Sequence, residues 1–72
     1  MRAEHHQRRR RELAGWPVTV TSYRLGERYV CEIESAGARL ARAEGPTREA
    51  SEDQALRSAA ARLGRTRVFA QP

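Results

Sequence analysis

The apolar residues within positions 47–63 recur at a spacing that fits one face of an α-helix. Five of them share a single stripe at about 3.6 residues per turn, and charged residues fill the remaining positions: Ala55, Leu56, Ala59, Ala60 and Leu63. Thr47 can accept a hydrogen bond from the first turn, and Gly64 is a natural stop. Ser51 offers a second possible start four residues later. The stretch therefore predicts an amphipathic helix with one buried side.

Three segments before this helix alternate with the period of β-strands. Positions 18–21 alternate branched apolar and small polar side chains, and positions 28–34 place Tyr29, Cys31 and Ile33 on one face. Positions 38–44 form a third strand, with turns near residues 26 and 35–37. In that strand Ala41 and Ala43 would share a face with residue 45, but Leu40 falls on the opposite face. The pattern predicts a hairpin meander that leads into the helix.

The predicted fold class is α+β, a three-stranded antiparallel sheet packed against a C-terminal helix (β-β-β-α). The folded domain would span residues 15–64. We expect residues 1–14 to form a basic arm or a short Arg-rich helix, because they have almost no apolar face. Removing such an arm would leave stability nearly unchanged. Residues 65–72 would form a C-terminal tail, read as a loose end in preference to an edge strand or a strap. The predicted core is Tyr29, Cys31, Ile33, Ala55, Leu56, Ala59 and Leu63.

The net charge of +5 is concentrated at the two ends of the chain. Residues 1–12 hold five Arg and two Glu, and residues 64–72 hold two Arg and no acid, whereas residues 13–63 hold seven of each sign. All 14 basic residues are Arg, with no Lys, which a GC-rich bacterial genome would also produce. The position of the Arg residues is thus more informative than their number.

Several functional classes have no support in the sequence. A chain of 72 residues buries only about 60% of its unfolded surface, which leaves no room for a deep catalytic pocket. Cys31 has no nearby His to act as its base, and adjacent His5 and His6 lack metal-ligand spacing. We expect no enzyme activity, metal or cofactor. The lack of a long apolar run argues against a membrane span, and the single Cys favours a reducing, cytoplasmic setting.

The β-β-β-α order resembles the double-stranded RNA-binding domain over residues 15–63. The family pattern G-x-S-K-K-x-A-K-x-x-A-A-x-x-A-L-x-x-L is matched in spacing by Gly45-x-Thr47-Arg48-Glu49-x-Ser51-Glu52-x-x-Ala55-Leu56-x-x-Ala59-Ala60-x-x-Leu63. The resemblance implies phosphate ligands at the start of the last helix. Arg48 takes the first of these positions, but Glu49 and Glu52 take the next two, where carboxylates would repel a phosphate backbone. A weaker resemblance, carried by residues 29–33 and by the step from Gly45 into an Ala-rich helix, is to small HicB-like antitoxin domains.

Two classes of function follow from these observations. The first is a small nucleic-acid-binding module, with RNA preferred over DNA, that binds through its Arg-rich arm with low sequence specificity. Its candidate contacts are Arg2, Arg8, Arg9, Arg10, Arg11, Arg48, Arg65 and Arg67. The alternative is a protein-interaction or homodimerisation module of the same fold that has lost RNA binding, since a small domain with a thin core gains stability from a partner.

Overall fold

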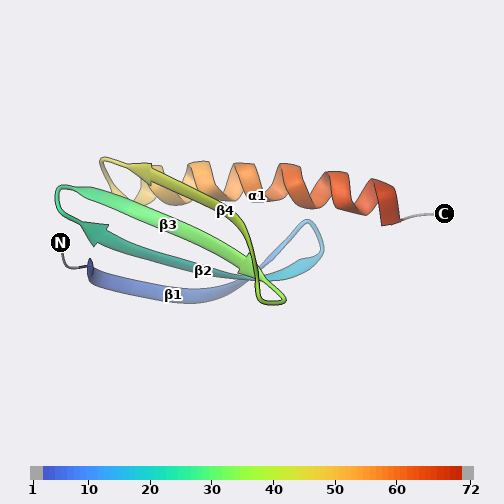
Figure 1. Cartoon of the computed structure of the whole chain (residues 1–72), viewed down its shortest axis with the longest axis horizontal. Helices are drawn as coiled ribbons and strands as arrows, with labels where there is room; N and C mark the ends of the chain where they lie inside the picture. The colour runs from blue at the N-terminus through green and yellow to red at the C-terminus, as the bar shows by residue number, and fades with distance from the viewer. Residues whose placement is uncertain (1–2, 71–72) are drawn as a thin grey trace.

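Four antiparallel strands in chain order are followed by one helix (Figure 1). The computed structural model describes residues 3–70, and side chains as far as residue 64. The elements are β1 (Ala3–Leu13), β2 (Trp16–Leu25), β3 (Arg28–Ser35), β4 (Ala38–Gly45) and α1 (Arg48–Ala70). The helix packs on one face of the sheet, mainly over β3 and β4, and its last turns extend past the sheet (Figure 1). The α+β class is confirmed, but the sheet has four strands and not three.

Each hairpin closes through a two-residue turn whose backbone suits the twist of the strands. Ala14 and Gly15, and likewise Ala36 and Gly37, all have positive φ, as a type I′ turn requires. Gly26, with φ of 66°, opens the turn between β2 and β3. Tight primed turns fix the register of each hairpin.

The expectation of an N-terminal arm or helix is wrong, because residues 3–13 form β1 along the edge of the sheet. The strand pairs with β2 from Ala3 opposite Leu25 to Leu13 opposite Trp16, with a bulge between Glu4 and Gln7. Its side chains are almost all exposed, so apolar burial does not hold it. Main-chain hydrogen bonds to β2, the tight turn after Leu13 and polar contacts with the start of α1 hold it instead.

The start of α1 agrees with the sequence and its end does not. The Ala50 N–H donates to Thr47 Oγ1 at 3.1 Å, so Thr47 is the N-cap and the later start at Ser51 is not used. The helix then continues through Gly64 to Ala70, which contradicts the predicted tail over residues 65–70; residues 71 and 72 lie outside the described part. Gly64 lacks the positive φ of a C-terminal cap, and no proline follows until residue 72.

The core is one layer between the sheet and α1. Its buried members are Val18, Val20, Cys31, Ile33, Ala43, Ala55, Ala59 and Leu63. Of the seven predicted core residues, Tyr29 and Leu56 are only partly buried. A bulge in the pairing of β3 with β4 turns Leu40 onto the core beside Ala41, which resolves the register problem in this strand.

The close approach of the helix to β4 depends on a residue without a side chain. A Cβ placed on Gly45 would lie 3.1 Å from the Ala50 Cβ and 3.1 Å from the Ser51 backbone nitrogen. Within residues 3–70, no helix is long and apolar enough to cross a membrane.

Candidate nucleic-acid interface

The Arg run of β1 is divided between the two faces of the sheet. Arg8 and Arg10 pair with Thr21 and Thr19, whose side chains lie on the face away from the helix, which we call the open face. Arg9 and Arg11 pair with Val20 and Val18, which point into the core. Since alternate residues of a strand lie about 6.6 Å apart, each face carries a short row of guanidinium groups.

Most Arg side chains outside β1 have acidic neighbours. Ion pairs join Arg28 to Glu44 at 3.4 Å, Arg39 and Arg42 to Glu32 at 3.8 Å, and Arg57 to Asp53. Glu32 of β3 is thus paired across the strands with Arg39 and Arg42 of β4. The pairs between β3 and β4 neutralise the far half of the open face.

The Arg side chains of β1 are less compensated. Arg9 pairs with Glu52 at 2.9 Å. Among the side chains of residues 3–64, Arg8, Arg10 and Arg11 form no ion pair or hydrogen bond. The uncompensated positive charge of the described surface therefore gathers on one edge strand, where a polyanion can reach it from both faces and from the edge.

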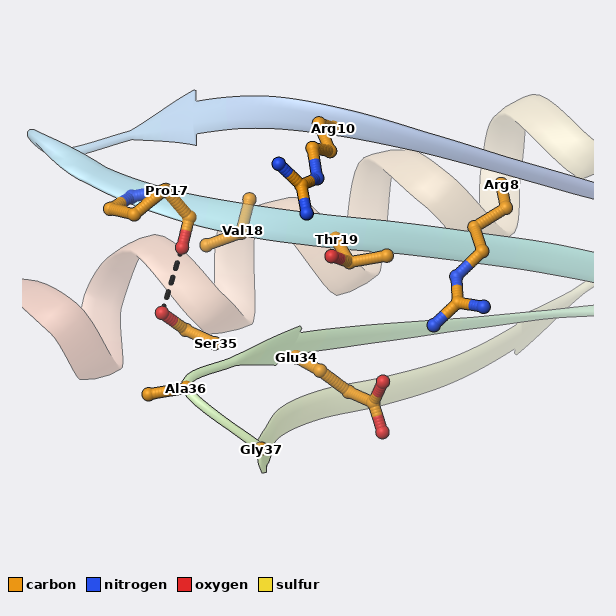
Figure 2. A pocket seen from close by; sticks show the side chains of 9 residues that line it. All are labelled: Arg8, Arg10, Pro17, Val18, Thr19, Glu34, Ser35, Ala36 and Gly37. Atoms are coloured by element: carbon orange, nitrogen blue, oxygen red, sulfur yellow. Dashed lines mark hydrogen bonds between the residues drawn. The ribbon is translucent and has the colours of Figure 1, made fainter.

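A hollow of about 430 Å³ opens on the open face beside these Arg residues (Figure 2). It is lined by Arg8, Arg10, Pro17, Thr19, Glu34 and Ser35, among others. Its origin is the row Arg10, Thr19, Glu34 across β1, β2 and β3, in which a short side chain lies between two long ones. The hollow was not predicted, because the row exists only when β1 pairs with β2.

An aromatic pair lies further along the same face. The His6 and Tyr23 rings stack with centroids 5.1 Å apart and planes at 29°. The Tyr23 hydroxyl donates a hydrogen bond to Glu32 at 2.9 Å. Burial, and to a smaller extent this carboxylate, raises the pKa of Tyr23. Nucleic-acid bases stack on such rings without regard to sequence. Neither residue was among the predicted contacts, since only the register brings His6 beside Tyr23.

Arg48, the first phosphate ligand implied by the family resemblance, is engaged inside the protein. Its guanidinium donates to the Ser22 hydroxyl at 2.6 Å and to the His5 carbonyl at 2.6 Å, and it lies over the Tyr29 ring at 5.2 Å. These contacts bind the bulged part of β1 to the start of α1. Its guanidinium is therefore already engaged and is not free to bind a phosphate.

The two acids at the start of α1 have different surroundings. Glu52 accepts hydrogen bonds from Ser22 and Arg9, both at 2.9 Å, and its side chain is only 12% exposed. Glu49 is exposed. Of these two acids, only Glu49 is thus placed to repel a phosphate that approaches the start of α1.

The remaining predicted contacts are not brought to β1 by any described interaction. Arg2 lies outside the described residues. Arg65 and Arg67 belong to the last turns of α1, but their side chains also lie outside the described part.

The described part of the chain holds no group arranged for catalysis at a metal. Within residues 3–70, no three His, Cys, Asp or Glu side chains gather as a metal site.

Cys31 is fully buried, as predicted for a core residue. Burial, with a smaller effect of Glu52, raises the pKa of its thiol to about 11. Its thiol therefore stays protonated at neutral pH and is a poor nucleophile.

Comparison of the chain with protein-family models, with curated proteins and with solved structures found no match.

Proposed function

We propose that this chain is a small nucleic-acid-binding module, with RNA as its preferred ligand, that binds the phosphate backbone through β1. The observation that carries the proposal is the position of Arg8, Arg10 and Arg11 on one exposed edge strand, with no acidic partner among the described side chains. The Arg guanidinium suits phosphate because it can donate two parallel hydrogen bonds. Fixing these groups on a strand also lowers the ordering cost that a disordered arm would incur on binding.

Two further features favour RNA with unpaired bases. The His6 and Tyr23 rings share the open face with Arg8 and Arg10, so bases can stack while phosphates meet the Arg row. Backbone and stacking contacts are alike for every base, which gives the low sequence specificity that we propose. The engagement of Arg48 and Glu52 inside the protein moves the proposed surface away from the start of the helix.

The test compares two variants with the same loss of charge. In the first, Arg8, Arg10 and Arg11 become Gln; in the matched control, Arg28, Arg57 and Arg62 become Gln. Fluorescence anisotropy with a labelled single-stranded RNA, measured over a series of salt concentrations, gives the affinity and the salt slope. Thermal unfolding of both variants confirms that they fold.

We expect the β1 variant to lose most of its affinity and the logarithmic salt slope to flatten by about 2, since each neutralised phosphate of a single strand contributes about 0.7. The control should keep most of its slope. Equal losses in the two variants would show that net charge acts without a defined surface. A wild-type chain that binds no RNA, duplex or single-stranded, would refute the function.

A further inference from the structure

The hollow beside β1 presents opposite charges across a short gap. Arg8 and Arg10 reach over β2 from one side, Glu34 stands on β3 at the other, and Thr19 lies between them (Figure 2). Arg10 and Glu34 flank Thr19 in the sheet register, so their backbones are two strand spacings apart, about 9.6 Å. A ligand in the hollow therefore meets a cationic wall and an anionic wall at once.

The groups on both walls are available to a ligand. Arg39 lies opposite Glu34 on β4 but makes its ion pair with Glu32. Among the side chains of residues 3–64, Glu34 forms no ion pair or hydrogen bond, as is also true of Arg8 and Arg10. The neighbouring Ser35 hydroxyl is already engaged, since it donates to the Pro17 carbonyl at 2.7 Å. The free hydrogen-bonding capacity is thus two guanidinium groups on one side, one carboxylate on the other and the Thr19 hydroxyl between them.

This pattern calls for a ligand with an anion at one end and a hydrogen-bond donor at the other. A nucleotide has both: a phosphate, and on cytosine, adenine or guanine an exocyclic amino group. Uracil and thymine lack that amino group: their ring N–H lies between two carbonyl oxygens, which a carboxylate repels, so these bases fit Glu34 less well. The volume of about 430 Å³ falls within the range of about 300 to 1,000 Å³ typical of small-ligand pockets.

We infer that the hollow holds one unpaired nucleotide, with its phosphate on Arg8 and Arg10 and the amino group of its base on Glu34. The inference rests on the proposed function and adds a base preference to it. A base in a duplex cannot enter, because its amino group is already paired and its ring is stacked, so the site selects single strands. At the hollow, cytosine is preferred over uracil.

Cytosine and uracil give the sharpest test, because the two bases differ only at one edge. Cytosine carries an amino group and an unprotonated ring nitrogen there, whereas uracil carries a carbonyl and a ring N–H. Short oligocytidylate and oligouridylate of equal length are titrated against the intact chain at neutral pH, where cytosine is unprotonated. The variant is Glu34→Gln, whose amide can both accept and donate. The matched control is Glu27→Gln, which removes the same charge from the exposed turn between β2 and β3.

We expect the wild-type chain to favour oligocytidylate by at least about fivefold, the lower end of the discrimination that one base-edge contact provides. Glu34→Gln should bring the ratio close to one while affinity for oligouridylate rises, and Glu27→Gln should keep the wild-type ratio. A wild-type ratio near one, or a ratio unchanged by Glu34→Gln, overturns the inference and leaves the backbone-binding function standing. Failure of both oligomers to bind overturns the proposed function itself.

Discussion

Replacing Glu52 by Ala tests the polar contacts that hold β1 to the helix. The substitution removes the acceptor for the Ser22 hydroxyl, which is 1% exposed, and the ion-pair partner of Arg9, which is 48% exposed. A buried donor left without an acceptor costs about 1 to 3 kcal/mol, and a half-exposed ion pair contributes about 0 to 1 kcal/mol. We expect a loss of about 2 kcal/mol in the free energy of unfolding.

Such a loss is large for this chain, because a domain of its size has an unfolding free energy on the order of 5 kcal/mol. The Tm should fall by roughly 10 °C, since a loss of 1 kcal/mol corresponds to about 4 to 8 °C in a domain this small. Urea and thermal unfolding followed by circular dichroism measure both quantities. Glu49→Ala is the control: it removes the same charge from the same helix end, but from an exposed position.

The difference between the two variants isolates the contacts of Glu52, because the effect of each acid on the helix dipole is similar. Glu49→Ala should change the unfolding free energy by no more than about 0.5 kcal/mol. In a chain that already carries Ser22→Ala, the cost of Glu52→Ala should shrink by at least about 0.5 kcal/mol, the coupling expected for contacting residues. Equal effects of Glu49→Ala and Glu52→Ala, or strict additivity with Ser22→Ala, would refute this account of the network.

Three further outcomes follow from the fold. Deleting residues 1–14 should lower the free energy of unfolding by at least about 2 kcal/mol, because it removes the hydrogen bonds that β1 forms and a disordered arm would lack. An unchanged Tm would contradict this role of β1. Gly45→Ala should cost about 1 to 3 kcal/mol of stability, because the new methyl group overpacks against the helix. Gly64→Ala, which places its methyl group in open space, should stabilise the chain by about 0.4 to 1 kcal/mol. Urea unfolding measures both effects. Burial raises the pKa of the Cys31 thiol from 9.0 to about 11, so the unfolded chain loses this proton at lower pH than the folded chain does. The stability that the buried, protonated thiol contributes is therefore complete below pH 9 and is lost as the pH rises toward 11. Urea midpoints over that range should therefore fall more steeply for the wild-type chain than for Cys31→Ala.

The parts of the fold that the sequence predicts are those where burial leaves a periodic trace. Cys31 and Ile33 alternate with charged residues because one face of β3 packs on the helix, and the helix stripe records the same packing from the other side. Thr47 marks the helix start through a capping hydrogen bond that needs no tertiary information. Both kinds of signal are local, so a single sequence is enough to read them.

The missed features depend on pairing between segments and not on burial. β1 carries Arg on both faces, so its side chains show no apolar alternation that would mark a strand before the turn at Ala14 and Gly15. The bulge that turns Leu40 inward is a property of two strands together. The hollow and the His6 and Tyr23 stack depend in turn on β1, so one missed strand concealed most of the candidate site.

The register of β1 also bears on the choice between nucleic acid and a second copy of this chain. An exposed edge strand of 11 residues is a template for pairing. Two copies joined along the whole strand about a twofold axis would place Arg8 opposite its own symmetry mate and Glu4 opposite Glu12, and like charges directly opposite each other destabilise a sheet. Sliding the register to avoid these pairs shortens the interface. The charge pattern that protects this edge from self-association therefore leaves it open to a polyanion, which meets the Arg side chains without needing the backbone of the strand.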